Sequence, residues 1–386
     1  MTTIPYGKHY IGKDDFKSVE DSLKSNKISD GKFVKIFENK LKTFLKSKYV
    51  LTTSSATSGL HLALLSINVN KNDIIIMPSI NFIAAYNMAI TLGAKVFLAD
   101  VDKITGQMTP LCVEKCIREK KLTRIKCIIN MYLGGCPENT AEFYKLKKKY
   151  KCILIEDACH ALGSYTKLKN KKIEIGSNKI SDISVFSFHP VKAVATGEGG
   201  CITTNSKKIF YQASKFKNHG IVRSKDHWNY DVFFNGFNYR LSDISSALGI
   251  SQLKKIKKFL KKRNEIATLY KKEFNNLKPY LTLPNYKKSS YNSYHLFVVS
   301  INFKKMKKNK DAFFKYMLKD KIICQLHYKP IYKFKVFKEK ISLKDFNNSE
   351  YYFNNAVSLP IYYDLKLKDQ NFIIKKVKRF IMSNIK

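Results

Sequence analysis

The first two-thirds of the chain alternates short apolar runs with longer stretches in which apolar residues recur every three or four positions. The runs have the length of strands, whereas the recurring spacing is typical of helices that bury one face. The predicted strands are residues 48–53, 72–78, 94–101, 125–130, 151–157, 183–189 and 199–205. The helices predicted between them are residues 57–67, 81–93 and 138–150.

Most of the predicted strands are apolar throughout instead of alternating between apolar and polar residues. A strand has this composition when helices cover both faces of its sheet, as they do in parallel α/β sheets. The pattern therefore predicts a doubly wound, mostly parallel α/β domain over roughly residues 30–240.

A long helical pattern follows at about residues 241–275, and we expect it to bridge two domains. Beyond it, residues 294–328 combine strand-like and helical patterns, which indicate a smaller α+β domain. We place the N-terminal arm and the large domain in residues 1–245, and the linking helix and the small domain in residues 246–386.

No stretch of the 386 residues is apolar for long enough to span a bilayer, although 44% of them are hydrophobic. The first residues, MTTIPYGKHYIGKDD, lack the charged leader and apolar core of a secretory signal. We therefore expect a cytoplasmic protein with no membrane partner.

The formal charge of +41 raises the question of a nucleic-acid partner. Only six of the 71 basic residues are Arg, the residue best suited to bidentate phosphate and base contacts, and the lysines are spread along the whole chain. No RNP-like, KH-like, zinc-finger or basic-zipper pattern is present. We predict no nucleic-acid binding, although a positive surface attracts anionic small molecules such as phosphates and nucleotides.

The eight cysteines show no CxxC spacing, and several of them lie inside apolar runs. Buried thiols in a reducing compartment explain this pattern better than disulfides or zinc do. We therefore predict no metal site.

Residues 51–65, LTTSSATSGLHLALL, follow a predicted strand and open a predicted helix. One interpretation is an ordinary N-cap by Ser or Thr. The other is a phosphate site, because hydroxyls and free N–H groups at a helix N-terminus attract an anion. The run of hydroxyl-bearing residues is longer than one cap needs.

Two carboxylates end the predicted strand 151–157, and His160 follows three residues after Asp157. Open α/β sheets bind ligands just outside the carboxyl ends of their strands, so Asp157 and His160 are candidate site residues. An aspartate that caps the next helix, with His160 packed against the sheet, explains the same residues.

The stretch SVFSFHPVKAVATGEGG brings Ser187, His189 and Lys192 to the end of another predicted strand. A lysine in a partly desolvated pocket has a lowered pKa, and its free amine is a nucleophile toward a carbonyl. The alternative is an exposed lysine beside a β-turn. The GEGG turn differs from the dinucleotide GxGxxG pattern, because a strand follows it instead of a helix.

Together, these candidates fit pyridoxal 5'-phosphate. That cofactor needs a lysine for a Schiff base, a carboxylate at its pyridinium nitrogen, a phosphate site and usually an aromatic ring stacked on its face. These groups are supplied by Lys192, by Asp157, by residues 54–59 with Ser187, and by Phe82, all at predicted strand ends.

The same segments resemble the sugar-nucleotide aminotransferases of the DegT/DnrJ/EryC1/StrS family, which are fold-type-I, aspartate aminotransferase-like enzymes. The matching segments, in order, are SSATSGLHLA, PSINFIAA, IEDACHALGS, SVFSFHPVKAVATGEGG, KNHGI and GFNYRLSDISSALGISQL. They cover most of residues 10–265. Within the family, SFHPVK, HGIV, NYRLSDISSALGISQLKK and QLHYKPIY are similar to the C4-aminotransferases of pseudaminic acid biosynthesis.

The resemblance implies a role for each matching residue. Lys192 would carry the cofactor as a Schiff base and act as general acid and base, and Asp157 would keep the pyridine nitrogen protonated. His160 would lie near the ring oxygen of the cofactor, and Phe82 would stack on its ring. Cys159 departs from the usual small Ala or Ser without removing a catalytic group.

The resemblance also implies contacts with the phosphate and the substrate. Ala56, Thr57 and Ser187 would hold the phosphate, and Asn238 would reach it from the neighbouring subunit, so that a homodimer is the minimal active form. The implied sugar-nucleotide contacts are Tyr6, Asn26, Lys27, Ile28, Ser29, Gln325, Leu326, His327 and Tyr328.

The reaction implied is transfer of an amino group from glutamate to C4 of a UDP-linked 4-keto-6-deoxy-N-acetylhexosamine. Other nucleotide-linked ketosugars, of the legionaminic acid, bacillosamine or perosamine type, or amination at C3, are alternatives within the family. A dehydrating branch carries His in place of the Schiff-base lysine, and Lys192 argues against it. A regulatory or nucleic-acid-binding protein on this scaffold should have lost part of the site, whereas every part is present here.

Overall fold

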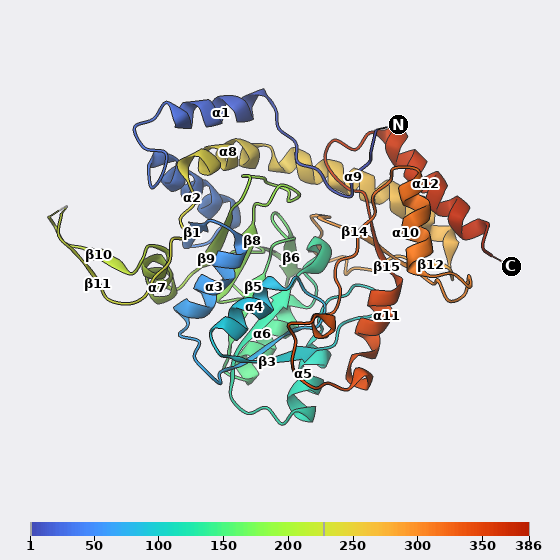
Figure 1. Ribbon diagram of the computed structural model, residues 1–386, viewed down its shortest axis with the longest axis horizontal. Coiled ribbons are helices and arrows are strands. Elements are labelled where there is room, and N and C mark those ends of the chain that lie inside the picture. Colours follow the sequence, from blue (N-terminus) through green and yellow to red (C-terminus); the bar gives the residue numbers. More distant parts are fainter. Residues whose placement is uncertain (1, 227, 386) are drawn as a thin grey trace.

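The computed structural model describes residues 2–226 and 228–385. It is built around a seven-stranded sheet with the order β1-β9-β8-β5-β4-β2-β3 (Figure 1). The strands are β1 (Tyr49–Thr53), β2 (Ile74–Pro78), β3 (Lys95–Ala99), β4 (Ile125–Met131), β5 (Ile153–Asp157), β8 (Ile183–Ser187) and β9 (Gly200–Thr204). Each of them lies where the apolar runs predict a strand, which confirms those predictions.

The direction of the strands brings several chain segments to one edge of this sheet. All neighbouring strands are parallel except β9, which runs antiparallel to both β1 and β8. Because β9 reverses, β1 points the same way as β8. The carboxyl ends of β1, β2, β5 and β8 therefore lie along the same edge, as parallel α/β sheets need for a ligand site.

Helices cover both faces of the sheet, which confirms the doubly wound prediction. One face packs against α3 (Ala56–Ser66), α4 (Ala84–Thr91) and α7 (Lys207–Lys217). The other face packs against α2 (Lys32–Leu45), α5 (Pro110–Glu119), α6 (Thr140–Lys149) and α8 (Asp243–Lys254). In β8, Val185 belongs to the first layer and Phe186 to the second, so both faces of the strand are buried.

The C-terminal third forms the smaller α+β unit. The helix predicted at residues 241–275 breaks at Lys255 into α8 and α9 (Ile256–Phe274). Helix α9 shares a core with α10 (Lys310–Lys319), α12 (Leu367–Met382) and the sheet β12-β14-β15 (Leu281–Thr282, Phe297–Ile301, Ala356–Leu359). Ile4 pairs with Ile322 and enters the same core, so the N-terminal arm also contacts this unit. The domain boundary at residue 245 stays a prediction.

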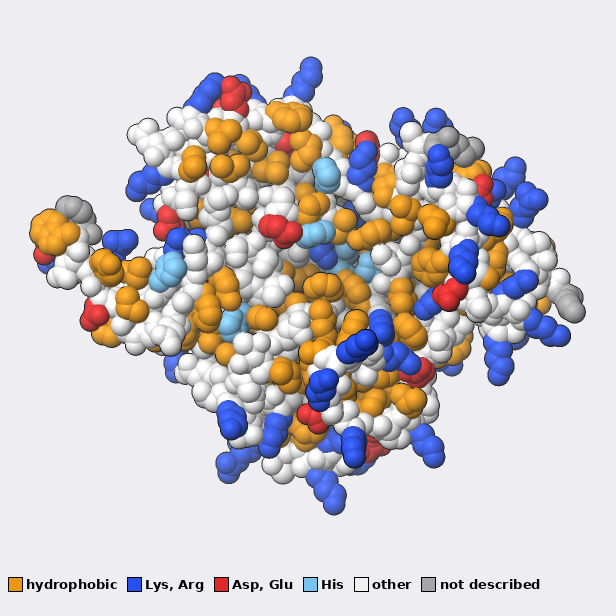
Figure 2. Space-filling model, in the orientation of Figure 1, with side chains coloured by type: hydrophobic (Ala, Val, Ile, Leu, Met, Phe, Trp, Pro, Cys, Tyr) orange, Lys and Arg blue, Asp and Glu red, His pale blue; other side chains and the backbone are white. Residues whose placement is uncertain are grey.

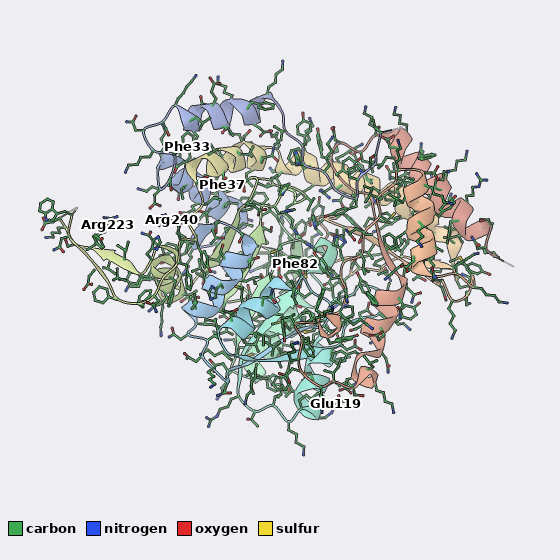
Figure 3. All side chains as sticks on the ribbon, in the orientation of Figure 1. Phe33, Phe37, Phe82, Glu119, Arg223 and Arg240 are labelled. Carbon is green, nitrogen blue, oxygen red and sulfur yellow. The ribbon has the colours of Figure 1, made fainter. Side chains whose placement is uncertain are left out.

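The remaining elements lie at the periphery. They are α1 (Lys13–Leu23), which packs on α8, α11 (Asn347–Asn355), the sheet of β6 (Tyr165–Leu168), β7 (Lys171–Glu174) and β13 (Ser290–Tyr291), and the short helical turns η1 (Leu133–Gly135), η2 (Asn275–Leu277), η3 (Ile331–Lys333) and η4 (Leu343–Phe346). The hairpin of β10 (Ile221–Arg223) and β11 (Tyr230–Val232) protrudes from the body, as the position of Arg223 in Figure 3 shows. Within the described ranges, every helix is too short or too polar to cross a membrane.

Candidate active site

A cavity of about 530 Å³ opens at the edge where the carboxyl ends of the parallel strands meet. This volume is typical of a site for a small molecule. Figure 2 shows a hollow at the centre of the visible face, where side chains of His and Lys lie close together. The cavity walls come from the large sheet domain, the N-terminal arm and the C-terminal unit, so the site depends on the docking of all three.

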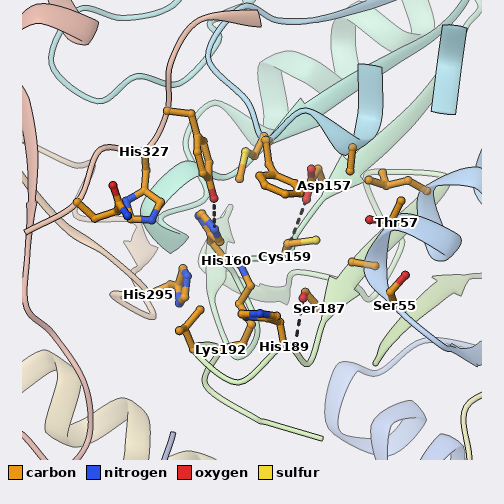
Figure 4. Close-up of a pocket in the computed structure, with 18 of the residues that line it drawn as sticks. Ser55, Thr57, Asp157, Cys159, His160, Ser187, His189, Lys192, His295 and His327 are labelled. Carbon is orange, nitrogen blue, oxygen red and sulfur yellow. Dashed lines mark hydrogen bonds between the residues drawn. The ribbon is translucent and has the colours of Figure 1, made fainter. Parts of the chain in front are cut away.

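Most of the predicted site residues line this cavity. They are Tyr6, Ala56, Thr57, Phe82, Asp157, His160, Ser187, Lys192, Gln325, Leu326, His327 and Tyr328. Figure 4 shows how strand ends and loops direct many of these side chains toward the same space. Residues far apart in the sequence are therefore neighbours in the fold.

Five predicted residues lie outside the cavity of the single chain. Asn26, Lys27, Ile28 and Ser29 are exposed in the connection between α1 and α2, and Ser29 pairs with Ser242. Asn238 is exposed and pairs with Asn218 near the base of the protruding hairpin. A contact of these residues with this cavity would need a second subunit or a movement of the chain.

Asp157 is the last residue of β5 and is 2% exposed. The N–H of Cys159 donates to its Oδ1 at 3.3 Å, and no Lys or Arg of the described residues forms an ion pair with it. Burial raises the pKa of Asp157, whereas the hydrogen bonds from Cys159 and the charge of Lys192 lower it. A buried carboxylate is costly without a cation, so this side chain fits a ligand that presents a positive charge.

Lys192 lies in the turn that follows β8, and its N–H donates to the carbonyl of His189 at 2.8 Å. The residue is half-buried and lines the cavity. Burial lowers the pKa of Lys192, and electrostatic interactions with Cys159 and Asp157 oppose that shift. A lysine of this kind loses its proton more readily than an exposed one and is the better nucleophile.

The start of α3 supplies donors for an anion. Ser55 is the N-cap, and its Oγ accepts from the N–H of Ser58 at 3.1 Å. The N–H groups of Ala56 and Thr57, the first two of the helix, have no partner within the helix. Thr57 and Ser187, which both carry a hydroxyl, also line the cavity. The segment therefore provides both the ordinary cap and N–H donors of the kind that attract an anion.

The GEGG turn is explained by the close approach of two elements. Strand β9 starts at Gly200, directly beside the start of α3. A Cβ at Gly200 would lie 2.7 Å from the nitrogen of Ala56 and 2.8 Å from the carbonyl oxygen of Phe186. Only glycine lets β9 pass there without displacing the helix start that lines the cavity.

Three buried histidines form the wall opposite the helix start. The ring centroids of His160 and His295 are 4.2 Å apart, and Nδ1 of His327 lies 2.8 Å from Oγ of Ser358. Burial lowers the pKa of His160 and of His295 well below the usual value, and that of His327 to about 3. The positive charge of Lys192 lowers all three further, so the three rings are neutral at neutral pH.

His295 is a cavity residue that the sequence analysis missed. It lies two residues before β14, and nothing in its neighbourhood distinguishes it from a core histidine of a strand. Ser55 and Glu198, which also line the cavity, belong to segments that the motifs did include. Met131, one residue beyond the predicted strand 125–130, also lines the cavity and was not predicted. His295 is the missed residue that the docking of the C-terminal unit brings to the site.

Comparisons with known proteins agree with this geometry. The chain matches the DegT/DnrJ/EryC1/StrS aminotransferase family over residues 9–378. It is 35% identical to the UDP-4-amino-4,6-dideoxy-N-acetyl-beta-L-altrosamine transaminase of Campylobacter jejuni subsp. jejuni serotype O:23/36, over 97% of this chain and 99% of the relative. It is also 33% identical to an uncharacterized protein of Methanocaldococcus jannaschii, over 99% of this chain and 98% of that one.

A solved structure extends the similarity to the fold. Helicobacter pylori PseC, an aminotransferase involved in the biosynthesis of pseudoaminic acid, matches with a TM-score of 0.89 at 31% identity. The match covers 99% of this chain and 100% of that one. The fold and the family that the motifs predict are both confirmed.

Proposed function

The chain belongs to the DegT/DnrJ/EryC1/StrS aminotransferase family, and on that premise we propose that it moves an amino group from glutamate to C4 of a UDP-linked 4-keto-6-deoxy-N-acetylhexosamine. The observation that carries the proposal is one cavity lined by the half-buried Lys192, by the buried carboxylate of Asp157, which forms no ion pair with the described residues, and by the N–H groups at the start of α3. The names of the Campylobacter and Helicobacter relatives support the choice of sugar.

The cavity residues fit pyridoxal 5'-phosphate, as the family implies. Lys192 would hold its aldehyde carbon, Asp157 its ring nitrogen, and Ala56, Thr57 and Ser187 its phosphate. Phe82 is 53% exposed although it lines the cavity, which leaves its ring free to stack on a planar ligand (Figure 3). When bound, this cofactor supplies an electron sink that stabilises negative charge on the substrate carbon that loses a proton.

Lys192 would perform the proton transfers. Its Nζ would accept the proton from Cα of glutamate in the first half-reaction and deliver a proton to C4 of the sugar in the second. The lowered pKa of Lys192 favours the free amine that the first transfer needs. In balance, glutamate becomes 2-oxoglutarate, and the ketosugar becomes an aminosugar.

Asp157 would act through charge. A carboxylate enclosed by protein stabilises a proton on the ring nitrogen beside it more strongly than an exposed one does. The neutral His160, placed between Asp157 and the C-terminal unit, would lie near the ring oxygen. Tyr6 and Gln325–Tyr328 line the cavity from the N-terminal arm and the C-terminal unit, and they would contact the sugar nucleotide.

We also propose a homodimer with shared active sites. The hairpin β10–β11 exposes Tyr230, Val232 and Phe233, and an exposed apolar group of this kind is typical of a contact surface. Asn238, near the base of this hairpin, would then reach the phosphate of the neighbouring subunit, which accounts for its position outside the cavity of its own chain.

The test uses the purified protein loaded with pyridoxal phosphate. Borohydride should fix the cofactor to the peptide that contains Lys192. Incubation with glutamate and a panel of UDP- and dTDP-linked 4-ketosugars, read by mass spectrometry, should yield an aminosugar from the UDP-linked N-acetylhexosamine. Amination of a different ketosugar alone would refute the substrate, and no amination with any of them would refute the activity.

A further inference from the structure

Both ring nitrogens of His160 have a fixed partner. The backbone nitrogen of Gly134 lies 3.3 Å from Nδ1. The hydroxyl oxygen of Tyr328 lies 3.1 Å from Nε2, and a dashed line in Figure 4 marks this contact. His160 is 3% exposed, and its ring packs against His295. The imidazole therefore cannot turn over without losing both hydrogen bonds.

The partners decide where the proton of His160 lies. A backbone N–H can only donate, so Nδ1, which faces Gly134, must be the acceptor and carries no proton. Burial and the charge of Lys192 lower the pKa of His160, so the ring is neutral and has a single N–H. That N–H must be at Nε2, and it donates to the hydroxyl oxygen of Tyr328.

The hydroxyl of Tyr328 therefore accepts from His160 and keeps its own hydrogen for another acceptor. Within the described ranges, Nε2 of His160 is the only protein group that hydrogen-bonds this hydroxyl. Burial and the nearby charge of Asp157 raise the pKa of Tyr328, so the phenol stays protonated at neutral pH. Tyr328 lines the cavity, and its ring centroid lies 5.8 Å from that of Phe82.

The turn η1 holds this arrangement in place. Gly134 and Gly135 have φ angles of +79° and +105°, which other residues rarely adopt. A Cβ at Gly135 would lie 2.3 Å from Oγ of Ser293, and that hydroxyl donates to the carbonyl of His160 at 2.7 Å. The turn thus presents the N–H of Gly134 to the imidazole, and Ser293 fixes the backbone behind it.

We propose that Tyr328 donates its phenol hydrogen to a negatively polarised oxygen in the cavity, and that Gly134 and His160 are positioning residues that keep this hydrogen available. This inference rests on the proposed function, which supplies two such oxygens: the ring oxygen of the cofactor and the carbonyl oxygen of the ketosugar. A neutral donor oriented in advance stabilises charge that develops on either oxygen in a site with little water.

The proton position can be measured without substrate. In the full chain labelled with 15N-histidine, with and without pyridoxal phosphate, NMR should show His160 as the neutral Nε2–H form at neutral pH. The His160→Gln variant assigns the signal by its loss. A neutral Nδ1–H form or a charged ring would overturn the proposal, and this result does not depend on the transaminase activity.

The donor role is tested with Tyr328→Phe, which removes only the hydroxyl. A shifted absorbance maximum of the bound cofactor would assign the acceptor to its ring oxygen. The acceptor is instead the carbonyl oxygen of the sugar if the spectrum and the glutamate half-reaction are unchanged while the ketosugar half-reaction slows by about tenfold or more.

The matched control is Tyr270→Phe, whose hydroxyl donates to the carbonyl of Pro360 at 3.0 Å in the buried core of the C-terminal unit. It should leave the spectrum and both half-reactions unchanged. If Tyr328→Phe also leaves the spectrum unchanged and both half-reactions within about twofold of the wild type, the proposal is wrong while the transaminase assignment stands.

Discussion

Nη1 of Arg263 lies 3.2 Å from the carbonyl oxygen of His295 and donates a hydrogen bond to it. The same nitrogen donates to the carbonyls of Tyr294 at 3.1 Å and Ile361 at 3.0 Å. Arg263 is 2% exposed, and no carboxylate of the described residues forms an ion pair with it. One buried cation on α9 thus joins the segment before β14, which brings His295 to the cavity, to the segment after β15.

Replacing Arg263 should destabilise the protein, because its guanidinium satisfies three buried carbonyls at once. Burial lowers the pKa of Arg263 to about 10, so the guanidinium is charged at neutral pH. In Arg263→Lys, the shorter side chain does not bring its ammonium to the position of Nη1 and leaves carbonyls unpaired, so we expect a loss of about 2 kcal/mol in the free energy of unfolding. Urea unfolding measures it, with the exposed Arg379→Lys as the control. Equal stability of the two variants would contradict the role of Arg263.

The sheet and one side of the site could be predicted because they follow local rules. A strand covered on both faces is apolar throughout, and Asp157, Ser187 and Lys192 each lie at or just after the end of such a strand. Parallel order then brings their ends to one edge. The resemblance added the residues at the far side of the cavity, Gln325–Tyr328, which periodicity alone does not indicate.

The rest depends on contacts between distant segments. The apolar run of β9 is the same whether the strand is parallel or antiparallel, so its reversed direction has no local signal. The approach of His295 to His160 depends on how the C-terminal unit docks on the sheet domain. Gly134 reaches His160 because β4 and β5 are neighbours in the sheet, and that pairing has no local signal either. The break of the long helix at Lys255 also lacks a glycine or proline that would mark it.

Asp157→Asn should abolish transamination and yet stabilise the cofactor-free protein at neutral pH. Burial raises the pKa of Asp157 in the folded state, so folding favours the protonated carboxyl. The stability that the protonated Asp157 contributes is fully present below the unfolded pKa of about 4. It is lost as the pH rises through the raised pKa of the folded state. Asn cannot ionise and avoids that loss, so we expect a gain of about 1 kcal/mol at neutral pH that disappears below pH 4 or so.

Urea unfolding of the cofactor-free protein at two pH values tests this prediction. Glu198→Gln is the control, because this exposed carboxyl lines the same cavity and its neutralisation should change stability little. A gain of the same size at both pH values, or a loss at neutral pH, would show that burial of the Asp157 charge is not its cause.

Gly200→Ala should weaken cofactor binding through the start of α3. The new Cβ would lie 2.7 Å from the nitrogen of Ala56, so the helix start must shift away from its present position. Because the N–H groups of Ala56 and Thr57 would hold the phosphate, we expect the Kd for pyridoxal phosphate to rise about tenfold or more. Titration monitored by absorbance measures it. Gly7→Ala is the control, since its Cβ would make an ordinary contact of 3.5 Å with Val191, and equal affinities would contradict the prediction.

Mixing two inactive variants tests whether Asn238 acts across a subunit interface. Lys192→Ala removes the amine from a subunit's own cavity, and Asn238→Ala removes the group that we assign to the neighbouring cavity. In a heterodimer of the two, one cavity combines an intact Lys192 with an intact Asn238 from the other subunit. When equal amounts of the two variants exchange subunits, half of the dimers are mixed, and one of the two sites in each mixed dimer is complete. We therefore expect about a quarter of the wild-type activity at limiting pyridoxal phosphate. If Asn238 served the cavity of its own chain, no mixture would contain a complete site and the activity would stay at the level of the separate variants.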